Sequence, residues 1–232
     1  MNRQQRRTAK ATARKAPVDP VTAIHEAGHA VFAVLLGLQE GWPSPNGALE
    51  YIEMWPKPSQ EILEKGGALG GWTEFAMFSP EMNAYVKPYL QRLVKNDKIQ
   101  IADLKPAFAE MQDKGIDVRR WLRARLLMSV AGAAAEARFT GKAIDDIYFH
   151  GEICRADHES VKRHCHLCAL TKDEYAAELE DALTLAEQQV EQPEIWAAIK
   201  ALAAQLKHGR TSADEAARII RQSMPEEQVS QP

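Results

Sequence analysis

The sequence has few cysteines and no excess of basic residues. Only Cys154, Cys165 and Cys168 occur among its 232 residues, and an odd number of thiols argues against a disulfide framework. Such cysteine usage fits a reducing cytoplasm. A formal net charge of -3 leaves no surplus of Lys and Arg to neutralise phosphates, so nucleic-acid binding by the chain as a whole is not expected.

The sequence also offers no evident membrane anchor and no nucleotide-binding loop. The longest apolar stretch near the N-terminus, Ala30 to Leu38, is too short to cross a bilayer. The first residues are basic and lead into Pro17, Asp19 and Pro20 rather than into the apolar segment of a signal peptide. No G-x-x-x-x-G-K-[ST] pattern occurs, which excludes a P-loop site for ATP. We therefore expect a cytoplasmic protein with no membrane anchor and no bound ATP.

The two ends of the chain differ in composition from the rest. Residues 1–20 contain several Lys and Arg with no acidic residue before Asp19, as expected of a disordered basic arm. The alternative is an arm that makes a weak, salt-sensitive contact with nucleic acid or anionic lipid. Residues 223–232 are expected to form a disordered tail. Residues 21–222 are then one folded domain.

Hydrophobic periodicity predicts a mainly α fold with a small β element. The first helix is expected over residues 21–36, with Asp19 as its N-cap and Gly37 as its stop. Further helices are predicted at residues 80–115 with interruptions at Pro88 and Pro106, at 118–139, 153–170, 172–191 and 193–207, and after Ser212. Strands are predicted at 48–55 and 67–75, and a polar connection at 144–151.

One short motif, His25-Glu26-Ala27-Gly28-His29, carries recognisable chemistry. Two histidines four residues apart project from the same face of a helix, where both imidazoles can bind one zinc ion. Glu26, beside the first ligand, can take a proton from the attacking water and deliver it to the leaving amine. The pattern predicts hydrolysis by a zinc-activated water.

Small residues are expected to let another chain segment approach this helix. Gly28 would allow a backbone to pass close to the turn that carries the metal. The run from Ala131 to Ala135 has little side-chain bulk, so another element can pack closely against it.

The motif needs a third ligand, and metal chemistry alone leaves several candidates open. Residue types that bind zinc in the helix after Gly151 are Glu152, Asp157, His158, Glu159, His164 and His166. Glu136 can orient His25 or His29 by accepting the ring N–H, although a surface carboxylate is the alternative. Cys165 and Cys168, with Cys154 upstream, are either a second metal site or buried inert thiols.

The motif and its surroundings resemble the peptidase domain of the FtsH family. Besides the histidine motif, the segment Gly67 to Thr73 resembles that family's alanine-leucine-glycine-x-threonine strand. Residues 131–136 resemble its alanine-glycine-arginine-x-alanine-glutamate helix, with Ala133 in place of the arginine. Residues 155–159 resemble its serine-asparagine-aspartate-leucine turn, and residues 202–220 resemble its C-terminal helical hairpin.

The resemblance implies an FtsH-peptidase-like helical zinc domain. Asp157 becomes the third zinc ligand beside His25 and His29, with Glu26 as the catalytic residue. The strand that borders the substrate cleft places Ala68, Leu69, Gly70 and Gly71 against an extended peptide. The family's ATPase module has no counterpart here, and residues 80–120 look like an insertion.

The function that follows is ATP-independent hydrolysis of peptide bonds in unfolded or flexible polypeptides, by a protein that can form oligomers. The alternative is a regulatory or binding module of the same fold that keeps zinc but hydrolyses little. The loss of the arginine at Ala133 favours the module, whereas Glu26, which is not a ligand, favours the enzyme.

Overall fold

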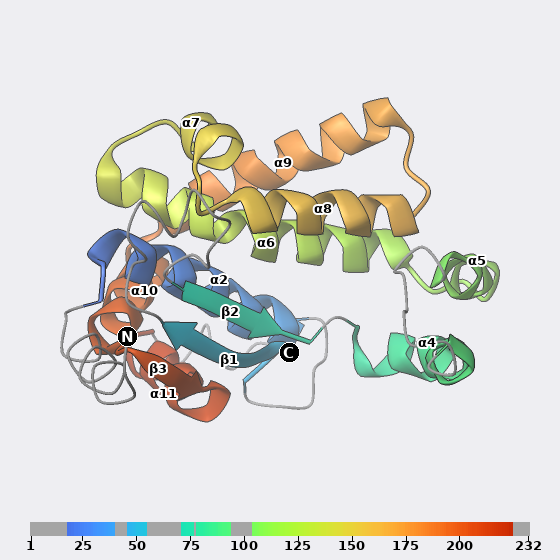
Figure 1. Ribbon diagram of the computed structural model, residues 1–232, viewed down its shortest axis with the longest axis horizontal. Coiled ribbons are helices and arrows are strands. Elements are labelled where there is room, and N and C mark those ends of the chain that lie inside the picture. Colours follow the sequence, from blue (N-terminus) through green and yellow to red (C-terminus); the bar gives the residue numbers. More distant parts are fainter. Residues whose placement is uncertain (1–17, 40–45, 55–70, 77, 94–103, 225–232) are drawn as a thin grey trace, which may run out of the picture.

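The computed structural model describes residues 18–39, 46–54, 71–76, 78–93 and 104–224. Within these ranges the protein is mainly helical with one three-stranded sheet, as predicted (Figure 1). The helices are α2 (Pro20–Gln39), α4 (Pro80–Leu93), α5 (Lys105–Asp113), α6 (Val118–Thr140), α7 (Ile144–His150), α8 (Arg155–Leu167), α9 (Lys172–Val190), α10 (Pro193–Gln205) and α11 (Ala213–Gln222). The strands are β1 (Leu49–Met54), β2 (Gly71–Phe75) and β3 (Gly209–Ser212). Most of the expected basic arm and tail lies outside the described residues.

Helix α2 is the centre of the molecule. It contacts α6 on one side, β1 and β2 on another, and α10 and α11 on a third, so nearly all of its residues from Thr22 to Val34 are buried. Figure 1 shows it between the sheet and the layer of α6, α8 and α9. Polar side chains on such a helix are removed from water unless a cavity reaches them, which makes its two histidines and one glutamate conspicuous.

The ends of α2 follow from local chemistry. The Asp19 carboxylate accepts hydrogen bonds from the Thr22 amide at 2.9 Å and from the Thr22 hydroxyl at 2.8 Å, so Asp19 is the predicted N-cap. Gly37 does not stop the helix, which continues to Gln39. A Cβ at Gly37 would lie 2.2 Å from the Ala48 nitrogen, so this glycine permits close approach of the chain that enters β1.

Helix α6 forms the other half of the core. The Asp117 side chain caps its first turn by accepting from the Arg120 amide, and Gly141 ends it in the left-handed conformation at φ 70°. Both ends agree with the prediction for this segment. Its alanine-rich middle is buried against α2, as the lack of side-chain bulk predicted.

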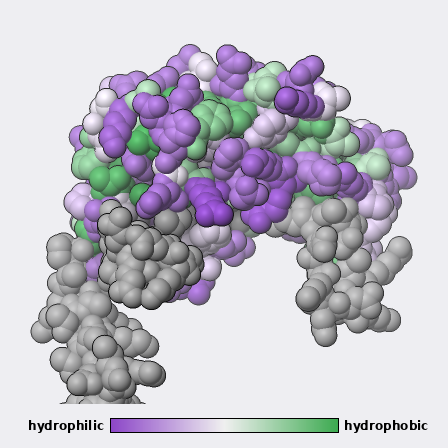
Figure 2. All heavy atoms as spheres, turned by 45° about the horizontal axis from the view of Figure 1, so that its top comes forward, coloured by the Kyte–Doolittle hydropathy of each residue, from purple (hydrophilic) through white to green (hydrophobic). Residues whose placement is uncertain are grey.

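Helix α9 covers the outer face of α6. Its N-terminus carries a capping box between Thr171 and Glu174. Ion pairs at its rim join Arg119 to Glu174 at 2.6 Å and Arg123 to Glu178 at 3.0 Å. Exposed pairs of this kind contribute roughly 0–1 kcal/mol, so burial of apolar side chains between the helices stabilises this layer more. Figure 2 shows the outer face of the molecule, where hydrophilic side chains surround small hydrophobic patches.

The sheet has the order β2-β1-β3, with both pairs antiparallel. The first two strands were predicted, although the part of the second from residue 67 to 70 lies outside the described residues. Strand β3 differs from the prediction, in which residues 202–220 form a helical hairpin and the segment between its helices is a turn. This strand is only four residues long and pairs with β1. Arg210 on β3 stacks on Tyr51 of β1, with its guanidinium 3.6 Å from the ring centroid.

Two further local predictions were wrong. The segment predicted as a polar connection at 144–151 contains helix α7 (Ile144–His150). Ile147 and Tyr148 are buried, and Asp145 and Asp146 lie in its first turn, where the helix dipole favours acids. Pro88 lies inside α4 without ending it. Pro88 is exposed, so water can reach the carbonyl group one turn earlier that loses its helical hydrogen bond.

Helices α4 and α5 fall within the segment expected to be an insertion, and Figure 1 shows them at one side of the molecule. Phe78, Phe108 and Trp121 connect this part to the start of α6, with ring centroids 5.1 to 6.0 Å apart. Aromatic contacts at such distances stabilise the docking of the two helices.

Residues Pro20–Gly37 are long and apolar enough to span a membrane by length and composition alone. The uninterrupted apolar run, Ala30 to Leu38, is much shorter than this window, which is why the run alone predicts no span. In the fold, 78% of the window is buried among other elements, as in the core helix of a globular domain. The absence of a membrane anchor stays a prediction.

Candidate metal centre

The three polar residues of the histidine motif are buried on α2, with the two histidines directed toward α6 and α8 and Glu26 directed toward β2. His25, Glu26 and His29 are 1%, 4% and 3% exposed. Helical spacing puts the two histidines one turn apart, with ring centroids 4.8 Å from each other. Asp157, in the first turn of α8, reaches the same place and is partly buried.

The tips of the two imidazoles and one carboxylate oxygen form a small triangle. His25 Nε2 lies 3.1 Å from His29 Nε2 and 3.3 Å from Asp157 Oδ2. His29 Nε2 lies 3.4 Å from the same oxygen. A tetrahedral ion with bonds of about 2.0–2.1 Å holds its ligands about 3.3–3.4 Å apart. The three atoms therefore have the spacing of ligands around one metal ion.

The hydrogen bond made by Nδ1 of each imidazole determines whether Nε2 of the same ring has a free lone pair. His25 Nδ1 lies 3.1 Å from Glu136 Oε2, and His29 Nδ1 lies 2.7 Å from the carbonyl oxygen of Met128. A carboxylate and a carbonyl only accept, so each Nδ1 carries its proton. In the neutral rings both Nε2 lone pairs then point into the triangle together with the Asp157 carboxylate. Three electron-rich atoms this close repel one another unless a metal ion or a proton lies between them.

Without a metal, protons take that position. Burial alone would lower the pKa of His25, but the hydrogen bonds to Asp157 and Glu136 and the charges of Asp157 and Glu26 outweigh it and raise that pKa to about 10. Burial also opposes ionisation of Asp157, yet the facing His29 and His25 lower its pKa to about 2. The pKa of His29 is raised as well, since Asp157 outweighs the effect of burial. The triangle attracts positive charge whichever cation supplies it.

The stability of the metal-stripped protein should accordingly depend on pH. A histidine whose pKa in the fold is about 10, above its ordinary 6.5, stabilises the fold fully below about pH 6.5 and loses this contribution as pH rises toward 10. We expect the Tm of chelator-treated protein to fall across this range. Restoring zinc at about 100 times its Kd should add about 2.7 kcal/mol of stability. Differential scanning fluorimetry measures both effects, and a flat Tm between pH 6.5 and 10 would contradict the assignment.

Glu26 is held beside the triangle by strand β2. Thr73 Oγ1 donates to Glu26 Oε2 at 2.7 Å and lies 3.0 Å from the Glu26 carbonyl oxygen. A Cβ at Gly71 would lie 2.6 Å from Glu26 Cγ and 3.0 Å from Oε1, so only glycine leaves room for this side chain. Burial raises the pKa of Glu26, although the two histidines and Thr73 oppose the shift. A carboxyl group with a raised pKa is suited to both accepting and delivering a proton.

Two glycines let α2 and α6 approach closely at the site. A Cβ at Gly28 would lie 2.7 Å from the Ala131 carbonyl oxygen, which confirms the predicted close passage of another backbone. A Cβ at Gly132 would lie 2.3 Å from His29 Nε2 and 2.7 Å from His25 Nε2. Gly132 thus forms the floor beneath the two ligand nitrogens.

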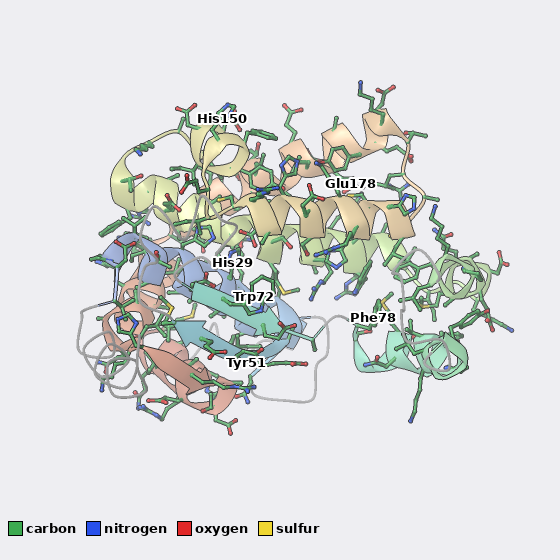
Figure 3. All side chains as sticks on the ribbon, viewed as in Figure 1. His29, Tyr51, Trp72, Phe78, His150 and Glu178 are labelled. Carbon is green, nitrogen blue, oxygen red and sulfur yellow. The ribbon has the colours of Figure 1, made fainter. Side chains whose placement is uncertain are left out.

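A cavity of about 190 Å³ connects the triangle to solvent. It is lined by residues of α2, β2, α6 and α8, among them Glu26, Trp72 and Asp157. Trp72 is 43% exposed at its rim, and Figure 3 labels Trp72 on β2 and His29 on α2. Of the residues predicted to bind substrate, Gly71 lines this cavity, whereas Ala68, Leu69 and Gly70 lie outside the described residues.

The structure separates the remaining ligand candidates from the triangle. Glu152, Glu159 and His166 are exposed. His158 faces Tyr175, with Nε2 3.4 Å from the phenolic oxygen, and contacts the rings of Tyr148 and Phe149. His164 lines the cavity, but among the described residues it belongs to no group that could hold a metal.

The cysteines are all buried free thiols, and burial raises the pKa of each. In the part of the chain that is described, Cys165 and Cys168 belong to no group of three metal ligands. Cys154 lies close to Glu136 and His25 Nδ1, a second combination with suitable ligand atoms. The hydrogen bond between His25 and Glu136 already uses that nitrogen, so we interpret Cys154 as packing behind the ligand.

Sequence reasoning missed several residues that shape the site. Gly132 was noted only as part of a small-residue run, and Thr73 only as part of a family-like strand. Arg125 and Ser129, which line the cavity, were not singled out at all. Their spacing of four residues on α6 was a signal, but α6 has buried residues on all sides, so the sequence did not show which face meets the metal site.

A scan against models of known protein families finds no match, and no curated protein matches the chain.

Proposed function

We propose that this chain is an ATP-independent zinc metallopeptidase that hydrolyses unfolded or flexible polypeptides. The observation that carries the proposal is the triangle of His25 Nε2, His29 Nε2 and Asp157 Oδ2, with edges of 3.1 to 3.4 Å. Two imidazoles and one carboxylate are a ligand set that zinc accepts, and three protein ligands leave one position open, as in catalytic zinc sites. Glu26 beside an open position distinguishes the site from a purely structural one.

The chain's own residues can manage the protons of amide hydrolysis. Bound zinc supplies the Lewis acid that polarises the scissile carbonyl and lowers the pKa of the attacking water. Glu26 takes the proton of that water, with Oε1 as the receiving atom because Thr73 already engages Oε2. The same carboxyl group then delivers the proton to the departing amine. Glu136 and the Met128 carbonyl keep the two imidazoles in the tautomer that binds metal.

The wall of the cavity supports a polypeptide as the substrate. Strand β2 lies at one end of the described sheet order and contributes Gly71, Trp72 and Thr73 to the cavity. An extended peptide can pair with such an edge by main-chain hydrogen bonds. The resemblance to the FtsH peptidase domain points the same way, with the histidine helix, the threonine-bearing strand and the aspartate in the same order along the chain. We accordingly propose unfolded or flexible polypeptides as substrates, because only an extended backbone can pair with the β2 edge.

The test combines metal analysis with turnover. Purified protein should contain about one zinc per chain and degrade casein. A chelator should stop cleavage, and zinc should restore it. Zinc bound without cleavage of any unfolded substrate would favour the alternative, a zinc-retaining regulatory or binding module. Protein that binds no transition metal at all would overturn the proposal.

Replacing Glu136 with Gln should weaken zinc binding about 10- to 100-fold, as loss of an orienting partner typically does. Gln can still accept from His25 Nδ1, but it lacks the negative charge that makes the imidazole a stronger donor to metal. Competition with a chromophoric chelator measures the affinity. Glu152→Gln, at an exposed carboxylate, is the matched control and should leave the affinity unchanged. Equal affinities for both variants would assign Glu136 a structural role only.

A further inference from the structure

The cavity at the metal centre continues along two polar stripes, one on α6 and one on α8. On α6 the stripe runs from Gly132 beneath the ligand nitrogens to Ser129 and Arg125, at helical spacing. On α8, Asp157, Ser160 and His164 line the same cavity in the opposite chain direction. The two helices pack against each other, and Figure 1 shows them side by side. The cavity is thus a trough that leads away from the triangle.

The far end of the trough contains buried polar groups whose hydrogen-bonding capacity is not met. Ser129 and His164 are each 2% exposed. Among the described residues, neither the Ser129 hydroxyl nor His164 Nδ1 has a hydrogen-bond partner. Leaving such a group unsatisfied costs about 1–3 kcal/mol, so both point to a polar ligand that enters the trough.

The same end carries positive charge. Arg125 is 5% exposed and donates from Nη1 to the Ala76 carbonyl oxygen at 2.8 Å, one of five donors on the guanidinium. Arg163 lies exposed at the rim. Glu26 and Asp157 lie at the metal end of the cavity, and Glu74 is the one other carboxylate among the described residues that line it. The Glu74 carboxylate accepts a hydrogen bond from Trp72 Nε1 at 2.7 Å. Arg125, Arg163 and Glu74 together give the described lining at this end a formal charge of +1.

His164 contributes a neutral hydrogen-bonding group rather than a further charge. Burial lowers its pKa well below the ordinary value, and the charges of Arg125 and Arg163 lower it further. A neutral imidazole can donate from one nitrogen while its ring stacks edge-on against Trp121, whose centroid is 5.5 Å away. Hydroxyl, imidazole and guanidinium together match a carboxylate, which accepts several hydrogen bonds and carries the opposite charge.

We propose that Arg125, Ser129 and His164 form a subsite for a carboxylate of the peptide substrate, close to the bond that is cleaved. Seven residues separate Gly132 from Arg125, which is about 10 Å along a helix axis. An extended peptide covers that distance in about three residues. The carboxylate therefore belongs to an acidic side chain, or to the free C-terminus, within about three residues of the scissile bond. This inference rests on the proposed peptidase function.

Quenched fluorescent peptides test the subsite on the zinc-loaded full chain. In one series a single Glu or Gln occupies each position within three residues of the cleaved bond, and both termini are blocked. In a second series a neutral peptide ends one to three residues after the cleaved bond with a free or an amidated C-terminus. A carboxylate in the right place should raise kcat/KM about 10- to 100-fold, as expected for charge-assisted hydrogen bonds. The series that responds identifies the source of the carboxylate.

Variants tie the preference to these residues. Ser129→Ala and Arg125→Gln should each reduce the preference for the carboxylate, measured as the ratio of kcat/KM for the carboxylate-bearing peptide to kcat/KM for the neutral peptide. Because Arg125 is buried, its replacement can impair folding, so Arg163→Glu provides an exposed change at the rim that should also reduce the preference. Lys162→Glu, an equal charge reversal on the adjacent exposed residue outside the cavity lining, is the matched control.

The outcomes separate the two proposals. Cleavage of neutral and carboxylate-bearing peptides at equal rates would overturn the subsite while the peptidase stands. A preference that Ser129→Ala and Arg163→Glu leave unchanged would likewise overturn it. Failure to cleave any peptide with zinc bound would overturn the peptidase and the subsite together.

Discussion

Replacement of Glu26 with Gln is expected to reduce peptide hydrolysis about 10²- to 10⁴-fold, the usual contribution of a general acid and base. Gln has the same shape, so it can still accept from Thr73 and fit against Gly71. It cannot take a proton from water at neutral pH. Zinc content should remain close to one per chain, because the three ligand atoms come from His25, His29 and Asp157.

A matched control removes a carboxylate elsewhere in the neighbouring sheet. Glu50, on β1, is exposed, and Glu50→Gln makes the same chemical change away from the cavity. We expect its kcat/KM to equal that of the unmodified protein. Glu26→Gln protein that retains both zinc and full turnover would show that Glu26 carries no catalytic proton. If Glu26→Gln protein loses both zinc and turnover, Glu26 instead contributes to metal binding.

Replacement of Gly132 with Ala is expected to weaken zinc binding at least about 10-fold and to lower turnover about 10²-fold. Its methyl group would lie 2.3 Å from His29 Nε2 and 2.7 Å from His25 Nε2, where the ligand nitrogens must converge. These atoms are the tips of side chains, so the rings can shift aside without moving the backbone. The metal-free fold should tolerate the change, because Ala inside a helix is ordinarily favoured over Gly by about 0.5–1 kcal/mol.

Gly28→Ala provides the contrasting case on the facing helix. Its methyl group would meet the Ala131 carbonyl oxygen at 2.7 Å and the Ala135 Cβ at 2.8 Å, so helix backbones rather than ring tips must move. We expect it to lower the Tm of both the zinc-loaded and the metal-stripped protein. Gly132→Ala should leave the Tm of the metal-stripped protein nearly unchanged. It should mainly reduce the rise in Tm that follows the addition of zinc. If the two variants behave alike, Gly132 acts on helix packing and not on the ligands.

The part of the site that could be predicted from sequence is the part that one helix determines. His25, Glu26 and His29 lie within five consecutive residues of α2, and helical periodicity alone puts the two imidazoles on one face. Capping by Asp19 and the end of α6 at Gly141 were predictable for the same reason, since neighbouring residues decide them. Small residues at Gly28 and along α6 likewise indicated a close approach of two helices.

Other features depended on which distant segments meet. Metal chemistry left six candidates for the third ligand, and the resemblance selected Asp157. In the fold, the start of α8 brings the Asp157 carboxylate to the two imidazoles, whereas His158 turns toward Tyr175. Strand β3 exists through its pairing with β1, which no local pattern of four residues encodes.

The sequence by itself thus determined a helix with two imidazoles on a shared face and a carboxylate beside the first of them, because backbone geometry over five residues is a short-range property. Tertiary structure decided that Glu136 and Met128 turn those imidazoles toward Asp157, that Gly132 lies beneath them, and that a trough leads from them toward Arg125. These relations arise where α2, α6 and α8 pack together, and packing depends on the whole buried surface rather than on any one segment.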